Sequence, residues 1–183
     1  MHHVVRIIIL LLAIEPGSQA WSQSSNIDEP SGYRMKAFRA DVPNTLTGAT
    51  VVGTKHAEKL WRQGSTVFLD VLPRPPKPKN LPEGTIWRDK KRKNIPGSFW
   101  LPNVGYGRLH PTMENYFKRH LERLTKNDLA KPILFYCLDR CWMSWNAAKR
   151  ALEYGYSDVY WYPQGTDGWS LELLPLEEKL PEK

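Results

Sequence analysis

The sequence predicts an α/β domain whose mostly parallel sheet is flanked by helices. Between residues 48 and 172, short β-branched and apolar runs alternate with segments whose apolar residues recur at helical spacing. Strands separated by helices form parallel sheets, because each return of the chain needs a crossover connection. The length of 183 residues corresponds to one such domain with appendages at its ends.

The predicted sheet has one short strand and three buried ones. Residues 49–52 form the short strand. Residues 66–72, 132–136 and 159–162 are apolar or β-branched runs, a composition typical of strands covered on both faces. Residues 73–82 are dense in proline, which excludes both a helix and a central strand there.

Three segments carry helical patterns. In the first, Thr54 is the expected N-cap, Gly64 ends the helix, and the buried face holds Ala57, Leu60 and Trp61. In the second, Thr112 is the expected N-cap of a helix that runs to about residue 125, and its apolar side holds Met113, Tyr116, Phe117, His120, Leu121 and Leu124. The third occupies residues 146–154, with Gly155 at the position that follows its C-cap.

The first 20 residues predict a secretory signal. Residues 1–6 carry a positive charge, residues 7–14 are apolar, and residues 17–20 supply the small side chains that signal peptidase recognises. We expect cleavage after Ala20; an uncleaved interfacial anchor is the alternative. Eight consecutive apolar residues are too few to span a bilayer, which needs about 20. We therefore expect an exported, soluble protein with no membrane span once the signal is removed.

The remaining chain divides into three parts. Residues 21–47 are polar and then irregular, and they predict a tether and lead-in, which we call the lead-in segment. Residues 48–172 form the predicted domain. Residues 173–183 are rich in Glu, Lys and Pro, and we expect this polar C-terminal tail to fray.

The chain is basic, with a formal charge of +7 that signal cleavage leaves unchanged. Residues 88–93 carry part of this charge in one run. Such a run is most often a solvated loop, and docking to an acidic protein partner is the alternative. Nucleic acid is not an expected partner of an exported protein of this kind.

Both cysteines of the chain lie in residues 137–141, which we call the cysteine loop. Cys137 follows a predicted buried strand, and Cys141 precedes the third predicted helix. Sites in parallel sheets form at the carboxyl ends of the strands. The free backbone N–H groups and the positive dipole end of a helix N-terminus favour a thiolate over a thiol. We therefore place the candidate catalytic site at Cys137 and Cys141.

Four chemistries are open to this pair in an oxidising compartment. A redox-active dithiol would use Cys137 as the thiolate and Cys141 as its resolving partner. A structural disulfide is sterically allowed, since the two Cα atoms can lie within about 4.4–6.8 Å, but so small a ring contributes only about 2 kcal/mol. The third chemistry is sulfur transfer on Cys137, and the fourth is metal binding.

The sequence offers few metal donors and no covalent haem site. Trp142 stands directly after the second cysteine, where c-type haem attachment requires a histidine. The histidines beyond the signal are His56, His110 and His120. His120 lies on a predicted helix face, where packing is more common than ligation. We expect no metal, with copper as the alternative ion.

The expected site extends beyond the cysteines. Asp70, at the end of a predicted strand, is expected to anchor the loop through backbone N–H groups. Trp142 and Trp145 are expected either to form a docking wall beside the loop or to be buried. The residues expected to line the loop or bind substrate are Leu138, Asp139, Arg140, Trp142, Met143 and Ser144.

Five short motifs follow one another in a fixed order. They are an apolar strand ending in an acidic residue (67–71), an Ile-Pro-Gly-Ser turn (95–98), a strand-terminal Tyr-Cys (136–137), a Gly-led return (155–159) and a Gly- and Trp-containing close (165–169). In this order they resemble the rhodanese-like domain family over residues 48–172. The resemblance implies a single rhodanese-like α/β domain with a strand-terminal nucleophile.

The segment from Cys137 to Ala151 resembles a narrower family, the PQQ-dependent catabolism-associated CXXCW motif proteins. Three residues separate the cysteines here, where the family name implies two. The resemblance implies a periplasmic location and an association with alcohol oxidation by quinoprotein dehydrogenases. The partners that it suggests are a PQQ-dependent dehydrogenase, a cytochrome c or a periplasmic binding protein. PQQ enters by this association alone, and no bound cofactor is expected.

The rhodanese site carries over only in part. Cys137 takes the place of the sulfur-carrying cysteine, and Ser144 that of the serine after the loop. Met143 then stands where an arginine usually ends the loop, which removes a bidentate anion clamp. Arg140 is a candidate substitute, although Asp139 beside it offsets its charge. We therefore do not expect ordinary rhodanese or phosphatase turnover.

Two hypotheses follow from the sequence. In the first, the cysteine pair performs thiol redox or sulfur chemistry, as a thiol–disulfide oxidoreductase or a sulfurtransferase-like enzyme, alongside quinoprotein alcohol oxidation. In the second, the protein is a non-catalytic module. Its disulfide-pinned loop, lined by tryptophans, and its basic surface would then dock a dehydrogenase, a cytochrome or a binding protein.

Overall fold

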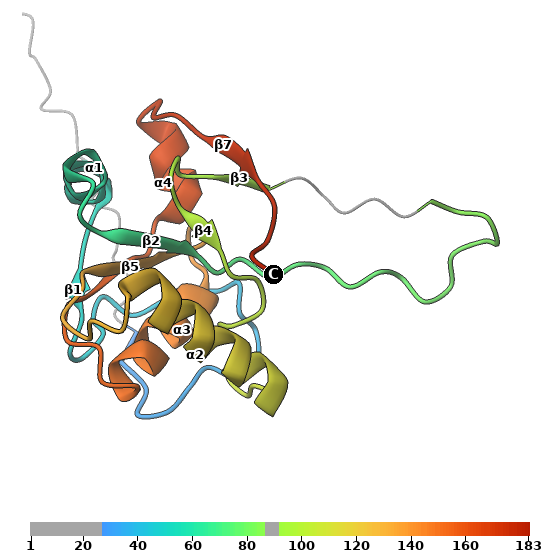
Figure 1. Cartoon of the computed structure of the whole chain (residues 1–183), viewed down its shortest axis with the longest axis horizontal. Coiled ribbons are helices and arrows are strands. Elements are labelled where there is room, and N and C mark those ends of the chain that lie inside the picture. The colour runs from blue at the N-terminus through green and yellow to red at the C-terminus, as the bar shows by residue number, and fades with distance from the viewer. Residues whose placement is uncertain (1–26, 87–91) are drawn as a thin grey trace, which may run out of the picture.

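A five-stranded parallel sheet forms the centre of the computed structural model, which describes residues 27–86 and 92–183 (Figure 1). The strands lie in the order β1 (Thr50–Val51), β6 (Val159–Tyr162), β5 (Ile133–Tyr136), β2 (Val67–Asp70) and β4 (Phe99–Trp100). Every neighbouring pair is parallel. The predicted α/β class and the mostly parallel sheet are confirmed. The predicted signal, residues 21–26 and most of the basic run lie outside the described residues.

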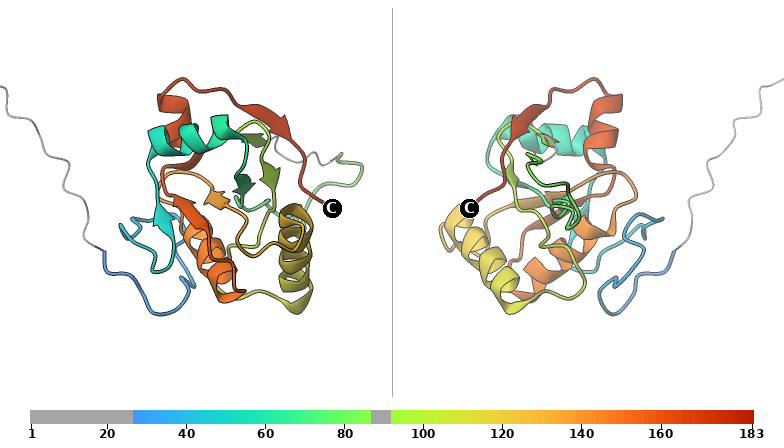
Figure 2. Two further views of the ribbon diagram at one scale, coloured as in Figure 1. Left: turned by 60° about the vertical axis from the view of Figure 1, so that its left-hand side comes forward. Right: turned by 90° about the vertical axis from the view of Figure 1, so that its right-hand side faces the viewer.

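Four helices cover the two faces of this sheet. α2 (Pro111–Thr125) and α3 (Trp142–Glu153) pack on one face, and α1 (Thr54–Gln63) and α4 (Gly165–Leu171) pack on the other (Figure 2). The side chains of β5 alternate between the two cores: Phe135 contacts the α2 and α3 side, and Leu134 the α1 and α4 side. Both faces of the sheet are therefore buried, as the apolar runs predicted.

Local signals placed some helix ends and missed others. Gly64 ends α1 in the left-handed conformation, with φ of 69°, as predicted. Gly53, rather than Thr54, is the N-cap of α1, and the Thr54 hydroxyl hydrogen-bonds the hydroxyl of Tyr162 at 2.8 Å. α3 begins at Trp142, immediately after the cysteine loop, and not at residue 146. The cysteine loop therefore leads directly into the first turn of a helix.

The C-terminal tail is ordered, so the prediction that it frays is wrong. β7 (Glu177–Lys179) pairs antiparallel with β3 (Arg92–Asn94) to form a second, two-stranded sheet. Farther on, the Glu182 N–H donates to the Trp100 carbonyl at 2.9 Å. The open backbone groups of β3 and β4 supply these partners, and a sequence pattern does not reveal such long-range pairing.

The described part of the lead-in segment, residues 27–47, lies against α3 (Figure 2). Asn146 of α3 fixes it through two hydrogen bonds: the Arg34 N–H donates to its side-chain oxygen, and its amide N–H donates to the Arg34 carbonyl, each at 2.9 Å. The proline-dense connection after β2 extends away from the sheet instead (Figure 1). In the described residues, no helix is long and apolar enough to cross a membrane.

We predict that Tyr136→Phe lowers the free energy of unfolding by about 1–3 kcal/mol, because it leaves the buried Ile95 N–H without a partner. The Tyr136 hydroxyl accepts the Ile95 N–H at 3.0 Å and hydrogen-bonds the Ser98 hydroxyl at 2.7 Å. Urea denaturation measures the effect. Tyr106→Phe is the control, since Tyr106 is 38% exposed. Equal losses of unfolding free energy in the two variants would show that the Tyr136 hydroxyl does not stabilise the turn of residues 95–98.

Candidate active site at the cysteine loop

The cysteine loop joins the central strand β5 to α3. Cys137 directly follows β5, and Cys141 is the N-cap of α3. The two side chains form a disulfide, with their Cα atoms 6.4 Å apart. Arg140, the residue before the second cysteine, adopts the left-handed conformation with φ of 51°. The structure therefore brings the two predicted catalytic cysteines together at the carboxyl end of the sheet.

The cysteines have almost no contact with solvent. Cys137 is 0% exposed and Cys141 is 1% exposed. The lead-in segment covers them through its backbone, since the Ala40 N–H donates to the Arg140 carbonyl at 3.2 Å and the Trp142 N–H donates to the Phe38 carbonyl at 2.9 Å. The disulfide is therefore not open to a reactant in this conformation.

The two tryptophans after the loop are buried under the same cover. The indole N–H of Trp142 donates to the Asp41 carbonyl at 2.9 Å, and that of Trp145 donates to the Thr45 carbonyl at 3.1 Å. Of the two arrangements expected for these rings, the structure shows burial, so they do not form an exposed docking wall. The sequence could not reveal this, because the covering segment lies about a hundred positions away in the chain.

Three groups that could bind an anion at the loop already have partners within the chain. The Asp139 N–H donates to the Asp167 carboxylate at 3.0 Å, and the Trp142 N–H is taken by Phe38. The Arg140 guanidinium forms an ion pair with Asp41 of the lead-in segment. Arg140 therefore does not take the place of the missing arginine, and Met143 at that position is a buried apolar side chain.

Ser144 lies at the disulfide. Its hydroxyl oxygen is 3.5 Å from the Cys137 sulfur, donates to the Cys141 carbonyl at 3.1 Å and accepts the indole N–H of Trp161 at 3.0 Å. The hydroxyl hydrogen can rotate, whereas the indole holds the oxygen in place. Ser144 can therefore donate to a thiolate on Cys137 when the disulfide opens. Leu138, the remaining predicted loop residue, packs partly buried against the core.

Arg92 is a site residue that the sequence analysis missed. Its guanidinium binds the buried Asp70 carboxylate, with Nε at 2.7 Å and Nη2 at 2.5 Å, and Nη2 also donates to the Cys137 carbonyl at 3.2 Å. The prediction of a solvated loop is wrong for Arg92, whose side chain is 11% exposed. The available signal was Asp70 itself, because a carboxylate at the end of a buried strand requires a charged partner.

Asp70 anchors the loop indirectly. Its carboxylate accepts the Leu72 N–H and the Asn94 amide N–H, each at 2.8 Å, in addition to Arg92. One backbone N–H therefore binds it, as predicted, but the link to the cysteine loop runs through Arg92. Burial raises the pKa of Asp70 from its ordinary 3.8 to about 6, against the lowering effect of Arg92.

The N-terminus of α4 closes the rear of the loop. The Thr166 N–H donates to the Cys137 carbonyl at 3.0 Å, and its hydroxyl lies 3.3 Å from the same oxygen. Gly165 has φ of 51°, and a Cβ atom there would overlap the backbone of Cys137. The Cys137 carbonyl is thus held from two elements, by Arg92 of β3 and by Thr166 of α4.

The histidines have structural contacts. His110, and not the predicted Thr112, caps α2 by accepting the Thr112 N–H at 3.3 Å. His120 is buried, with its ring 3.1 Å from the Lys183 carbonyl. Within residues 27–86 and 92–183, no group of three or more His, Cys, Asp or Glu side chains is arranged to hold a metal ion.

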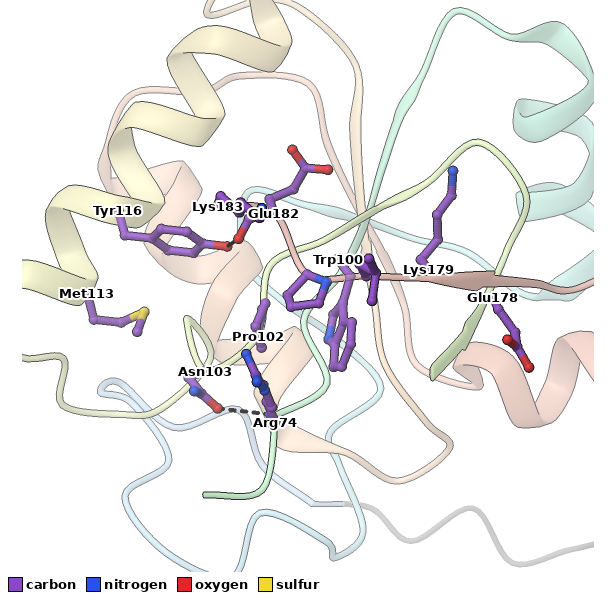
Figure 3. Close-up of a pocket in the computed structure, with 12 residues that line it drawn as sticks. Arg74, Trp100, Pro102, Asn103, Met113, Tyr116, Glu178, Lys179, Glu182 and Lys183 are labelled. Atoms are coloured by element: carbon purple, nitrogen blue, oxygen red, sulfur yellow. Dashed lines mark hydrogen bonds between the residues drawn. The ribbon is translucent and has the colours of Figure 1, made fainter. Parts of the chain in front are cut away.

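A separate groove of about 740 Å³ lies between α2 and the C-terminal tail (Figure 3). Its walls include Trp100, Met113 and Tyr116, and the Tyr116 hydroxyl donates to the Glu182 carbonyl at 2.9 Å. The described residues of the cysteine loop do not line it. The groove exists because the tail folds back on the sheet, and it is distinct from the candidate active site.

The pattern of the rhodanese-like domain matches residues 55–172, so the chain belongs to the rhodanese-like domain family. The expectation from the short motifs is confirmed at this level. No curated protein matches the chain significantly.

Solved structures with related architecture include sulfur-handling proteins. The thiosulfate sulfurtransferase from Pseudomonas aeruginosa is 16% identical with a TM-score of 0.48, over 73% of this chain and 21% of that one. The polysulfide-sulfur transferase homodimer from Wolinella succinogenes is 18% identical with a TM-score of 0.44, over 72% of this chain and 80% of that one. An uncharacterized Saccharomyces cerevisiae protein is 22% identical with a TM-score of 0.41, over 68% of this chain and 92% of that one. The chain thus spans about a fifth of the length of the Pseudomonas protein.

We predict that Gly165→Ala lowers the free energy of unfolding by about 2–4 kcal/mol, through a left-handed backbone and a steric clash. Gly97→Ala is the matched control, since Gly97 has φ of 78° but open space around its Cβ position, and it should lose only about 1 kcal/mol. Thermal or urea unfolding measures both. Equal losses would show that Gly165 does not need its close approach to Cys137.

We predict a pH-dependent contribution from Asp70. Its pKa is higher in the fold than in the unfolded chain, so the folded protein binds more protons between about pH 4 and pH 6. The unfolding free energy contributed by this group therefore falls as pH rises through that range, by up to about 3 kcal/mol, and is level above it.

Urea denaturation of the wild type and Asp70→Asn at about pH 4 and about pH 7 tests this, because the variant lacks the titration. The unfolding free energy of the wild type should exceed that of Asp70→Asn by less at about pH 7 than at about pH 4. Exposed Glu83→Gln controls for the change in net charge. If this difference in unfolding free energy instead grows with pH, Arg92 lowers the pKa of Asp70 in the fold.

Proposed function

We propose that this protein is an exported rhodanese-like domain whose Cys137–Cys141 pair performs thiol–disulfide exchange as an accessory to PQQ-dependent periplasmic alcohol oxidation. One observation carries the chemical part: the disulfide joins the nucleophile position after β5 to the N-cap of α3. The predicted export signal supports the periplasmic location, and the segment from Cys137 to Ala151 supports the link to quinoprotein oxidation through its resemblance.

Thiol–disulfide exchange fits this site better than sulfur transfer from thiosulfate. A sulfurtransferase needs cationic or N–H donors around the anion on its cysteine. Here Met143 stands in the arginine position, Arg140 is paired with Asp41, and the Asp139 N–H is bound to Asp167. A disulfide, by contrast, needs no anion cradle in its resting state.

The exchange uses two electrons and proceeds in two steps. An incoming thiolate attacks the Cys141 sulfur, a new S–S bond forms, and the Cys137–Cys141 bond breaks with its electron pair on Cys137. The leaving thiolate is stabilised by the N-terminus of α3 and by the Ser144 hydroxyl, 3.5 Å away. A second thiolate of the reactant then attacks the reactant's own sulfur in the mixed disulfide and releases Cys141. The reactant dithiol becomes a disulfide, and this protein gains two thiols.

A non-catalytic binding module is the second candidate, and the sealed disulfide favours it. In that case the exposed face beside the loop would bind an acidic partner. Lys36 and Arg39 are exposed on the lead-in segment, and the Arg140 side chain is 62% exposed. The candidate partners are a PQQ-dependent dehydrogenase, a cytochrome c or a periplasmic binding protein.

We predict a reduction potential above about −300 mV for the Cys137–Cys141 pair, the range of exchangeable rather than structural disulfides. Equilibration with glutathione or dithiothreitol buffers, read by thiol alkylation and mass spectrometry, measures it. In Cys137→Ser, Cys141 should accumulate as a stable mixed disulfide with glutathione, because no resolving thiol remains.

Two outcomes would contradict the exchange reaction. A potential below about −300 mV would identify the bond as structural and favour the binding module. A thiosulfate-dependent persulfide on Cys137 of the reduced protein would instead identify sulfur transfer. Ser144→Ala is an informative variant, since loss of its hydroxyl should slow reduction while leaving the disulfide intact.

A further inference from the structure

The lead-in segment pairs with the cysteine loop as a short antiparallel strand. The Trp142 N–H donates to the Phe38 carbonyl at 2.9 Å, and the Ala40 N–H donates to the Arg140 carbonyl at 3.2 Å. Between these two bonds, Arg39 lies directly opposite Cys141. A backbone edge at the candidate active site is therefore occupied by an extended segment of the same chain.

The register of this pairing places position 39 beside the disulfide. The two hydrogen bonds flank Arg39 and Cys141 and do not join them, so the two residues form a non-hydrogen-bonded pair. In such pairs the Cα atoms are about 4.5 Å apart and the side chains lie close together on one side. A thiol carried at position 39 of the paired strand would therefore lie within reach of the Cys141 sulfur.

The neighbouring side chains of the segment make specific contacts as well. Asp41 forms an ion pair with Arg140 of the cysteine loop. The ring of Phe38 packs edge-to-face on Tyr106, with the ring centroids 5.3 Å apart. The edge thus accepts an aromatic residue before the position opposite Cys141 and an acidic residue two positions after it.

We propose that residues 38–41 act as a pseudosubstrate, and that the substrate is an extended, cysteine-containing segment of a partner protein that replaces them. The partner segment would pair antiparallel with residues 140–142, with its cysteine opposite Cys141. Its preferred sequence is an aromatic residue, the cysteine, any residue and an acidic residue. This inference rests on the proposed exchange reaction and names its substrate class, a protein strand and not a small thiol.

The reaction in this register balances without another reagent. The partner thiolate attacks the Cys141 sulfur, the partner–Cys141 bond forms, and the electron pair of the broken disulfide passes to Cys137. A second cysteine of the partner then attacks the partner's first sulfur and releases Cys141 as a thiolate. The partner leaves with a disulfide, and its two thiol protons pass to solvent or to Cys137 and Cys141.

Register selectivity tests the docking edge. The full chain carrying Cys137→Ser keeps a single thiol, on Cys141, and is treated with peptides activated as thionitrobenzoate disulfides. The matched peptide is Lys-Ala-Phe-Cys-Ala-Asp, which is residues 36–41 with cysteine in place of Arg39. The shifted peptide is Lys-Cys-Phe-Arg-Ala-Asp, with cysteine in place of Ala37. Release of thionitrobenzoate gives the rate of reaction at Cys141.

We expect the matched peptide to react at least about tenfold faster than the shifted peptide, a difference of roughly 1.4 kcal/mol. A matched peptide with Asn at its last position should be slower, because it lacks the partner of Arg140. Equal rates for all three peptides would overturn the proposal. The activated cysteine alone measures the intrinsic reactivity of Cys141 and corrects every rate.

Competition by the chain's own segment is tested by a second pair of variants. Asp41→Asn in the same Cys137→Ser background removes the ion pair with Arg140 and should raise the rate of the matched peptide about threefold or more. Glu58→Gln removes a distant ion pair with Arg62 and should leave that rate unchanged. A rate that Asp41→Asn does not raise would show that residues 38–41 do not occupy the substrate position.

The failure of this inference is distinguishable from the failure of the proposed function. Register selectivity is measured on a free Cys141 thiol, so it does not depend on the potential of the pair. If the matched peptide reacts faster but the reduction potential of the Cys137–Cys141 pair is below about −300 mV, the docking edge is supported and the exchange reaction is contradicted. If the peptides react at equal rates but the potential is above about −300 mV, the docking edge is contradicted and the exchange reaction is supported.

Discussion

A carboxylate and a guanidinium, Asp70 and Arg92, meet almost out of solvent where the central strand β2 ends. Burying a charged pair costs several kcal/mol per ion, and the cost is offset only when the remaining donors and acceptors are satisfied. Asp70 meets this condition through Leu72, Asn94 and Arg92. Arg92, held by Asp70, also donates a hydrogen bond to the Cys137 carbonyl. The geometry of the cysteine loop therefore depends on an ion pair that contains no loop residue.

The lead-in segment lies against the disulfide at the N-terminus of α3. A thiolate at a helix N-terminus reacts readily when solvent reaches it. Here the lead-in segment excludes solvent through two backbone hydrogen bonds, two indole N–H groups and one exposed ion pair. Exposed ion pairs and single hydrogen bonds are individually weak, about 1 kcal/mol each. Opening of residues 38–41, which the proposed exchange requires, breaks the two backbone hydrogen bonds and the ion pair.

The cysteine loop follows the central strand β5, and two of its groups that could bind an anion already have partners in the chain. The amide of Asp139 and the side chain of Arg140, which could face an anion, bind acidic side chains of the same chain. Ser144, in the first turn of α3, places its hydroxyl 3.5 Å from the Cys137 sulfur. These contacts fit a leaving thiolate better than a bound oxyanion, in agreement with the exchange reaction that we propose.

The sequence by itself determined the α/β class, the three buried strands, the glycine that ends α1 and the location of the cysteines after β5. These features depend on local periodicity and on single-residue backbone preferences, which a sequence displays directly. Only the tertiary structure decided that Arg92 binds Asp70, that the tail pairs with β3, and that Trp142 and Trp145 lie under the lead-in segment. These contacts join residues far apart in the chain, and a buried charge or an open strand edge shows that it needs a partner but not which segment provides it.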